Sequence, residues 1–243
     1  MNGNALLLAA ALLPMLAAPF VWHLGTREKR SSLNSMALVC ALELVLAAVV
    51  GFEALRGREL SFTLEGFCGQ GLRMRADGFR SLYALVACIM WLVSGIFSRD
   101  YMAHEHAVPR YCFFTLMTLG AVIGMFLSDS IFSIFIFFEI MSLASYPWVA
   151  HEEDKAAMRA GETYLYIAVI GGLTMLMGIF LLPAGVAAAP LAQLPQLCAG
   201  QKLWLPALLM LVGFGAKAGA FPLHIWLPKA HPVAPAPASA LLS

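Results

Sequence analysis

Long apolar runs alternate with short polar segments along the whole chain. Seven of the runs reach the roughly 20 residues that an α-helix needs to cross a bilayer, and they lie at 4–24, 34–55, 79–98, 111–128, 130–149, 161–182 and 203–221. No Lys or Arg precedes the first run, so we expect a retained helix there and not a cleaved signal peptide. The pattern predicts an all-α polytopic membrane helix bundle with seven spanning helices.

The polar segments between the runs are expected to be loops: short and basic at 25–33, long and polar at 56–78, and charged and solvated at 151–159. Asp129, in the short connection before the fifth run, is the expected N-cap of the next helix. Segment 183–202 fits either a short amphipathic piece on the membrane surface or a loop, and we expect the loop.

The chain changes character after the seventh run, where five prolines follow at 222, 228, 232, 235 and 237. No regular helix runs through such a segment. Gly215 and Gly219 flank Lys217 in a G-x-x-x-G spacing that is typical of a close helix approach. Together these features predict a discontinuous seventh helix, followed by the start of an eighth.

Composition agrees with a membrane protein, because 61% of the 243 residues are apolar and only 12% are charged. Soluble domains carry about 25% charged residues. The net charge of +1 and the absence of a basic patch give no reason to expect nucleic acid as a partner. The five cysteines have no C-x-x-C spacing, and no phosphate-binding, dinucleotide or zinc-protease motif is present. We expect neither a cofactor nor a metal in this chain.

Two charges interrupt the apolar runs: Glu139 near the middle of 130–149, and Lys217 within 203–221. Placing a charge at the bilayer centre costs about 2.5 kcal/mol or more, so such residues mark ion or proton pathways by default. The structural alternatives are a protonated Glu139 that packs through a hydrogen bond and a Lys217 that extends to the membrane surface. We expect the pair to act together in proton exchange.

Four further residues are candidates for the same pathway. Glu43 falls in the middle of the second run, where a pathway role and a structural hydrogen bond are both open. His224 and His231 flank Lys229 in the proline-rich segment. A histidine there can relay protons near neutral pH, or brace the loop.

Two strings make the pattern more specific: Phe-Phe-Glu-Ile-Met-Ser-Leu-Ala-Ser-Tyr at 137–146, and the long segment at 213–243 that contains Lys217, His224 and Lys229. They resemble the antiporter-like membrane subunits of respiratory complex I, energy-converting hydrogenases, formate hydrogenlyases and multisubunit cation/proton antiporters. The string Ala-His-Pro-Val-Ala-Pro at 230–235 is more similar to the hydrogenase and formate hydrogenlyase branch. By this resemblance, Glu139 is the family's glutamate on the fifth helix and Lys217 its lysine on the discontinuous seventh.

The resemblance implies a proton- or Na⁺-translocating subunit of a redox-driven complex, itself without a catalytic centre, in the inner membrane of a prokaryote. Its partners would be other membrane subunits and the lipid bilayer. Two departures matter: Lys229 stands where an acidic residue is common, and family members usually continue to about fourteen helices. Residues 1–243 would then be a single transmembrane domain, the N-terminal part of a longer subunit. The alternatives are that the chain belongs to a cation/proton antiporter, or that it supports assembly without conducting ions.

Overall fold

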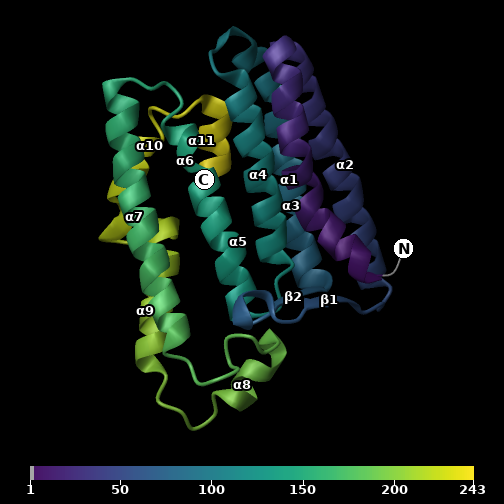
Figure 1. Cartoon of the computed structure of the whole chain (residues 1–243), viewed down its shortest axis with the longest axis vertical. Coiled ribbons are helices and arrows are strands. Elements are labelled where there is room, and N and C mark those ends of the chain that lie inside the picture. Colours follow the sequence, from purple (N-terminus) through teal and green to yellow (C-terminus); the bar gives the residue numbers. More distant parts are fainter. Residues whose placement is uncertain (1–2) are drawn as a thin grey trace.

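Seven long helices dominate the computed structural model, which describes residues 3–243 (Figure 1). The long helices are α1 (Gly3–Arg27), α2 (Lys29–Leu55), α3 (Gly78–Tyr101), α4 (Val108–Phe126), α5 (Ile131–Ala144), α7 (Lys155–Phe180) and α9 (Trp204–Ala218). Four short helices lie between or after the long ones: α6 (Tyr146–Val149), α8 (Leu194–Leu197), α10 (Leu227–Ala230) and α11 (Ala236–Leu242). Single 3₁₀ turns lie at η1 (Phe67–Gly69), η2 (Met102–His104), η3 (Leu191–Gln193) and η4 (Leu223–Trp226).

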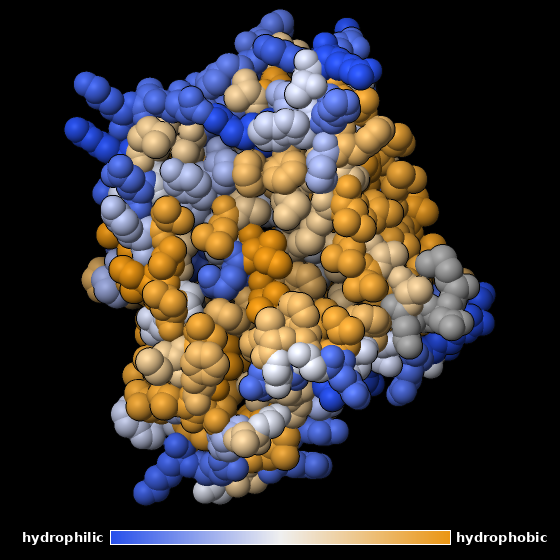
Figure 2. Space-filling view, in the orientation of Figure 1, coloured by the Kyte–Doolittle hydropathy of each residue, from blue (hydrophilic) through white to orange (hydrophobic). Residues whose placement is uncertain are grey.

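The surface supports a transmembrane arrangement. Figure 2 shows an apolar band around the middle of the molecule, with hydrophilic residues gathered at both ends of the long axis. Seven helical segments are long and apolar enough to cross a bilayer. The chain is therefore an integral multi-pass membrane protein, as the apolar runs predicted.

The helices form two groups that meet along α5. In the first group, α1 packs against α2 and α4, and α2 packs against α3. In the second, α7 packs along α9, and α5 contacts both α4 and α7. The short α11 returns to α3, where the Ser94 hydroxyl donates a 3.2 Å hydrogen bond to the Pro237 carbonyl. The C-terminal segment thus joins the second group back to the first.

The long polar segment 56–78 is not only a loop. It forms an antiparallel hairpin of β1 (Leu60–Leu64) and β2 (Leu72–Ala76), in which Leu60 lies opposite Ala76. Alternate residues of β2 are buried, which is the period expected when one face of a strand packs on helices. The prediction of a loop missed this hairpin because its two strands are only five residues long.

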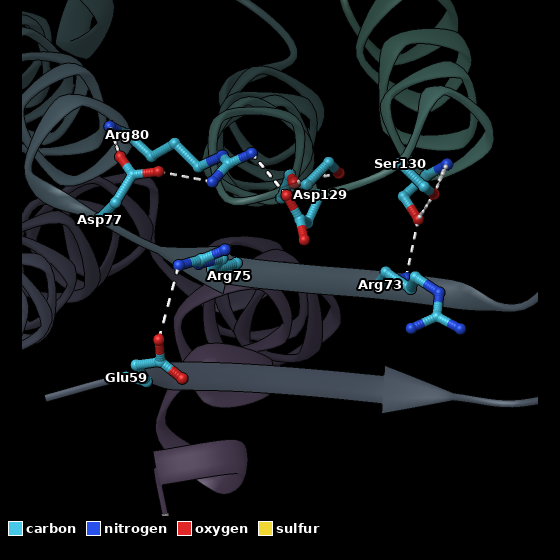
Figure 3. Close-up of polar contacts among 10 residues, drawn as sticks. Glu59, Arg73, Arg75, Asp77, Arg80, Asp129 and Ser130 are labelled. Carbon is cyan, nitrogen blue, oxygen red and sulfur yellow. Dashed lines mark hydrogen bonds and ion pairs between the residues drawn. The ribbon is translucent and has the colours of Figure 1, made fainter. Parts of the chain in front are cut away.

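Beside the hairpin, an ion-pair network joins the start of α3 to the connection between α4 and α5 (Figure 3). The Arg80 guanidinium donates to Asp77 at 2.5 Å and to Asp129 at 2.6 Å. Asp129 is therefore not the helix cap that the sequence predicted. Ser130 caps α5 instead, because its hydroxyl accepts a 3.1 Å hydrogen bond from the Ser133 N–H.

Segment 183–202 is mostly the expected loop, with two short turns at η3 and α8. It lies at the hairpin end of the bundle (Figure 1). Two backbone hydrogen bonds attach it there, from the Leu191 N–H to the Asp129 carbonyl at 3.0 Å and from the Phe132 N–H to the Ala187 carbonyl at 3.0 Å.

Two loops are shorter than predicted. Between α1 and α2 only Glu28 is extended, so the expected loop at 25–33 is almost entirely helical. The close turn is possible because Gly25 has no side chain, and a Cβ there would lie 2.8 Å from Ser32. Helix α7 likewise begins before its apolar run, because the Asp154 side chain caps it by accepting a 2.6 Å hydrogen bond from the Ala157 N–H.

Candidate functional site

The seventh spanning segment is broken directly after Lys217, which confirms the predicted discontinuity. Helix α9 ends at Ala218, and Gly219 follows in the left-handed conformation with φ +69°. This conformation favours glycine, because a Cβ would be strained there. The chain then turns into η4, and the Trp226 indole N–H donates a 2.9 Å hydrogen bond to the Ala216 carbonyl. Trp226 thereby satisfies one of the carbonyls that the break leaves free.

The close helix approach uses different glycines from those predicted. Gly219 ends the helix, and a Cβ on Gly215 would meet only Ala220 of the same segment. The contact between α7 and α9 instead involves Gly213, where a Cβ would lie 2.7 Å from the Gly171 carbonyl oxygen. The G-x-x-x-G interpretation of positions 215 and 219 was therefore wrong, although the two helices do pack closely.

Lys217 reaches across to the junction between α5 and α6. Its ammonium donates a 3.1 Å hydrogen bond to the Ser145 hydroxyl and a second hydrogen bond to the Tyr164 hydroxyl. The ammonium nitrogen also lies 4.7 Å from the centroid of the Tyr164 ring and 5.9 Å from that of Trp226. A cation over aromatic faces gains electrostatic stabilisation. The half-buried lysine thus has polar and aromatic partners within the protein and does not extend to the membrane surface.

Glu139 lies on α5, with its carboxyl against α7. A Cβ on Gly172 would be 2.7 Å from the carboxyl carbon of Glu139, so only glycine leaves space for this group. Its Oε1 atom is buried and has no hydrogen-bond partner in the part of the chain that the structure describes. Glu139 also takes part in none of the ion pairs among the described residues.

Two serine hydroxyls lie along α5 between the two charges. Ser142 and Ser145 follow Glu139 at successive intervals of three residues, so each is a neighbour of the next on the helix surface. The Ser142 hydroxyl is buried without a partner among the described side chains. The Ser145 hydroxyl lies 2.6 Å from the Tyr164 hydroxyl, which donates to the Ser142 carbonyl at 2.8 Å. Glu139 and Lys217 thus lie at the two ends of a short row of hydroxyl groups.

The other predicted site residues do not join this row. His224 stacks on Phe221, with ring centroids 5.6 Å apart, and its Nδ1 atom is buried without a described partner. Lys229 is exposed, and its ammonium lies 3.3 Å from the Thr163 hydroxyl. His231 Nδ1 is 2.8 Å from the Ser239 hydroxyl, a contact that braces the C-terminal segment.

Glu43 is separate from the pair. It is fully buried on α2, and neither of its carboxylate oxygens has a partner among the residues that the structure describes. Helix α2 packs against α1, α3 and α4. The structure therefore places Glu43 in the first helix group, and Glu139 and Lys217 where the second group meets α5.

The charged turn after α6 is exposed at Glu152, Glu153 and Asp154, as predicted, but its first residue is not solvated. His151 is only 1% exposed. Its carbonyl accepts hydrogen bonds from the Arg110 guanidinium at 2.8 Å and from His106 Nε2 at 3.0 Å. Burial, and then the charges of Arg110 and His106, lower the pKa of His151 to about 4. Arg110 also forms an ion pair with Glu153, which lowers the pKa of that exposed carboxyl.

Sequence reasoning missed the residues that hold Lys217. Ser145 had a signal, because hydroxyls recur at intervals of three residues after a membrane-embedded carboxyl. Tyr164 and Trp226 had none, since each is one of several aromatic residues in apolar or proline-rich segments. Only the packing of α7 and η4 around the broken helix brings them to the lysine.

Comparisons with known proteins identify the family of the chain. Residues 128–243 match the family model described as NADH:quinone oxidoreductase/Mrp antiporter, transmembrane, and this range contains both Glu139 and Lys217. Hydrogenase-4 component B of Escherichia coli (strain K12) is 33% identical over 175 residues, which are 71% of this chain and 26% of the relative. The chain belongs to the complex I and Mrp family of antiporter-like membrane subunits.

Two further proteins, one known from its sequence and one from its solved structure, are also similar to this chain. The A/B component of a probable K(+)/H(+) antiporter from Rhizobium meliloti (strain 1021) is 30% identical over 218 residues, 86% of this chain and 21% of the relative. A solved chain of the archaeal membrane-bound sulfane sulfur reductase has the same fold, with a TM-score of 0.83 at 22% identity, over 98% of this chain and 49% of that chain. The chain thus spans about a quarter of these curated relatives and about half of the solved one.

Proposed function

We propose that this antiporter-like subunit translocates protons, or Na⁺, as part of a redox-driven membrane complex. The observation that supports this most strongly is the position of Lys217. The lysine lies at the end of a broken membrane helix and is held by Ser145 and Tyr164, at the opposite end of the row of hydroxyl groups from Glu139. An ionisable pair inside a membrane bundle is typical of a proton relay.

The geometry supports a simple exchange cycle. A protonated Lys217 is stabilised by two hydroxyl oxygens and two aromatic rings. When the Glu139 carboxyl loses its proton, the negative charge holds the ammonium more strongly. When Glu139 takes up a proton, that attraction is lost and Lys217 releases its own proton more readily. The unpartnered Ser142 hydroxyl between them can take part in a hydrogen-bonded path.

The remaining predicted residues belong to other parts of the proposed path. His224 has a buried, unpartnered ring nitrogen in the segment that follows the broken helix, which suits a relay. Glu43 is buried in the first helix group without a hydrogen-bond partner among the described residues, which favours a neutral carboxyl. We assign it to a second proton-binding position on the path. Lys229 contacts Thr163, and His231 contacts Ser239. We assign Lys229 and His231 to the entrance of the proposed proton path.

We place the complex in a prokaryotic inner membrane, with other membrane subunits as partners, and 1–243 as a single transmembrane unit of a longer subunit. The hydrogenase-4 relative favours a hydrogenase or formate hydrogenlyase type of complex. The antiporter relative favours the second candidate function, cation/proton antiport.

The test uses the native complex reconstituted in vesicles, with Glu139→Gln in this chain. Ion translocation is measured together with the electron-transfer rate. We expect translocation to fall at least tenfold. Glu162→Gln is the matched control, because Glu162 is exposed on α7. Unchanged translocation in Glu139→Gln would refute the pathway and favour a non-conducting assembly role.

A further inference from the structure

Two loops meet at the end of the bundle opposite the β-hairpin (Figure 1). His106 comes from the loop between α3 and α4, and His151 and Glu152 come from the loop between α6 and α7. One potential ligand atom from each residue lies within 4.8 Å of the other two. The proposed ion pathway uses none of these residues, so their grouping needs a separate explanation.

His151 is the fixed member of the group. It is 1% exposed, and both of its ring nitrogens are buried without a hydrogen-bond partner among the described residues. A buried polar atom without a partner costs about 1–3 kcal/mol, so such atoms usually have a ligand or a bound water. Two neighbouring rings also position the imidazole. The centroid of the His151 ring lies 6.2 Å from that of Tyr111, in an edge-to-face arrangement, and 5.0 Å from that of His106.

The surroundings of His106 resemble an outer shell of a metal site. His106 Nε2 lies 3.0 Å from the His151 carbonyl. Metal-binding histidines almost always donate their second ring N–H to a carbonyl or carboxylate, which orients the ring. Arg110 is the nearby positive charge, and its ion pair with Glu153 offsets the repulsion that it would exert on a cation.

We propose that His106, His151 and Glu152 bind a divalent transition-metal ion of the Zn²⁺ class. Two imidazoles and one carboxylate are a ligand set that suits Zn²⁺, with one position left for water. Ligand atoms around one tetrahedral Zn²⁺ lie about 3.4 Å apart. Glu152 is exposed and forms no ion pair among the described residues, so its side chain is free to move toward the two imidazoles while His106 keeps its hydrogen bond to the His151 carbonyl.

Such an ion would connect the α3–α4 loop to the α6–α7 loop. The α6–α7 loop follows the junction at Ser145, which holds Lys217. The proposal is independent of the proposed function, because it concerns binding and its measurement needs no ion translocation.

The test uses the full-length chain in detergent with a tag that contains no histidine, after treatment with a chelator. Zn²⁺ binding is measured by isothermal titration, and Co²⁺ is added as an optical probe. We expect one equivalent of Zn²⁺ to bind, and Co²⁺ to give the absorption bands of a nitrogen- and oxygen-ligated site. Glu152→Gln and His106→Ala should each weaken Zn²⁺ binding at least tenfold.

The controls separate this site from other histidines and from misfolding. His104→Ala removes an exposed histidine two residues from His106 that is outside the group, and should leave binding unchanged. Because His106 and Glu152 are exposed, their variants should fold normally. Equal Zn²⁺ affinity in the wild type, Glu152→Gln and His106→Ala would overturn the proposal, and so would the absence of stoichiometric Zn²⁺ binding in the wild type.

Discussion

The ammonium of Lys217 donates a hydrogen bond to the hydroxyl of Tyr164 and lies 4.7 Å from the centroid of the same ring. One side chain thus stabilises the buried charge in two ways. Tyr164 is 1% exposed and contacts Trp226 edge to face at 5.0 Å. The tyrosine is therefore held in place, with its hydroxyl bonded to the Lys217 ammonium.

Removal of that hydroxyl should impair translocation. Tyr164→Phe keeps the ring but removes the hydroxyl that accepts from Lys217. A hydrogen bond to a charged group contributes about 1.5–3 kcal/mol, so we expect the translocation rate of the reconstituted complex to fall about tenfold or more. Tyr166→Phe is the control, because Tyr166 is 64% exposed. Equal rates in the two variants would show that the Tyr164 hydroxyl has no role in the exchange.

Gly172 should be essential for the position of the Glu139 carboxyl. In Gly172→Ala the new methyl group would overlap the carboxyl and force it away from α7. The atoms that must move are the far end of a flexible side chain, so we expect little change in the unfolding temperature but slower translocation, because the carboxyl is displaced. Gly78→Ala is the matched control, since nothing lies within 4 Å of a Cβ there. If both variants translocate ions at the wild-type rate, the position of the Glu139 carboxyl against Gly172 has no role in the exchange.

The ion pair between Arg80 and Asp129 should stabilise the junction of α3 with the α4–α5 connection, to which the hairpin is attached by the hydrogen bond from the Asp129 N–H to the Arg73 carbonyl. Its side chains are only 15% and 11% exposed, and Arg80→Ala would leave Asp129 without its partner. Loss of one partner of a buried pair costs about 3–5 kcal/mol, and partial solvation reduces the expected cost to about 2 kcal/mol. Thermal unfolding and limited proteolysis of the hairpin measure the effect. Arg58→Ala, at a pair whose arginine is 66% exposed, should change stability by less than about 0.5 kcal/mol, and a similarly small change for Arg80→Ala would contradict the account.

The apolar pattern was sufficient to predict the helices but not all of their ends. Membrane spans depend on runs of about 20 apolar residues, so the seven spans could be read directly. The start of α7 could not, because charged residues such as Lys155 continue a helix beyond the apolar run when a cap like Asp154 is present. The hairpin was missed for a related reason, since short strands that are buried on one face look like polar loop.

The candidate site was predictable in its charges but not in its partners. Glu139 and Lys217 are visible because a charge inside an apolar run is costly. Their neighbours depend on tertiary packing, in which α7 supplies Tyr164 and η4 supplies Trp226. The burial of His151 was also missed, because a run of charged residues normally indicates solvent, and the contacts come from the α3–α4 loop (His106) and the first turn of α4 (Arg110), both distant in the sequence.

The central claim is that Glu139 and Lys217 work as one exchanging pair. A double-mutant cycle tests it most directly, with translocation per electron measured in the reconstituted complex for Glu139→Gln, Lys217→Ala, the double variant and the wild type. Groups that act as a unit are strongly non-additive. We predict that the double variant is no slower than the slower single variant. Effects that multiply, so that the double variant loses the product of the two single losses, would contradict a coupled pair.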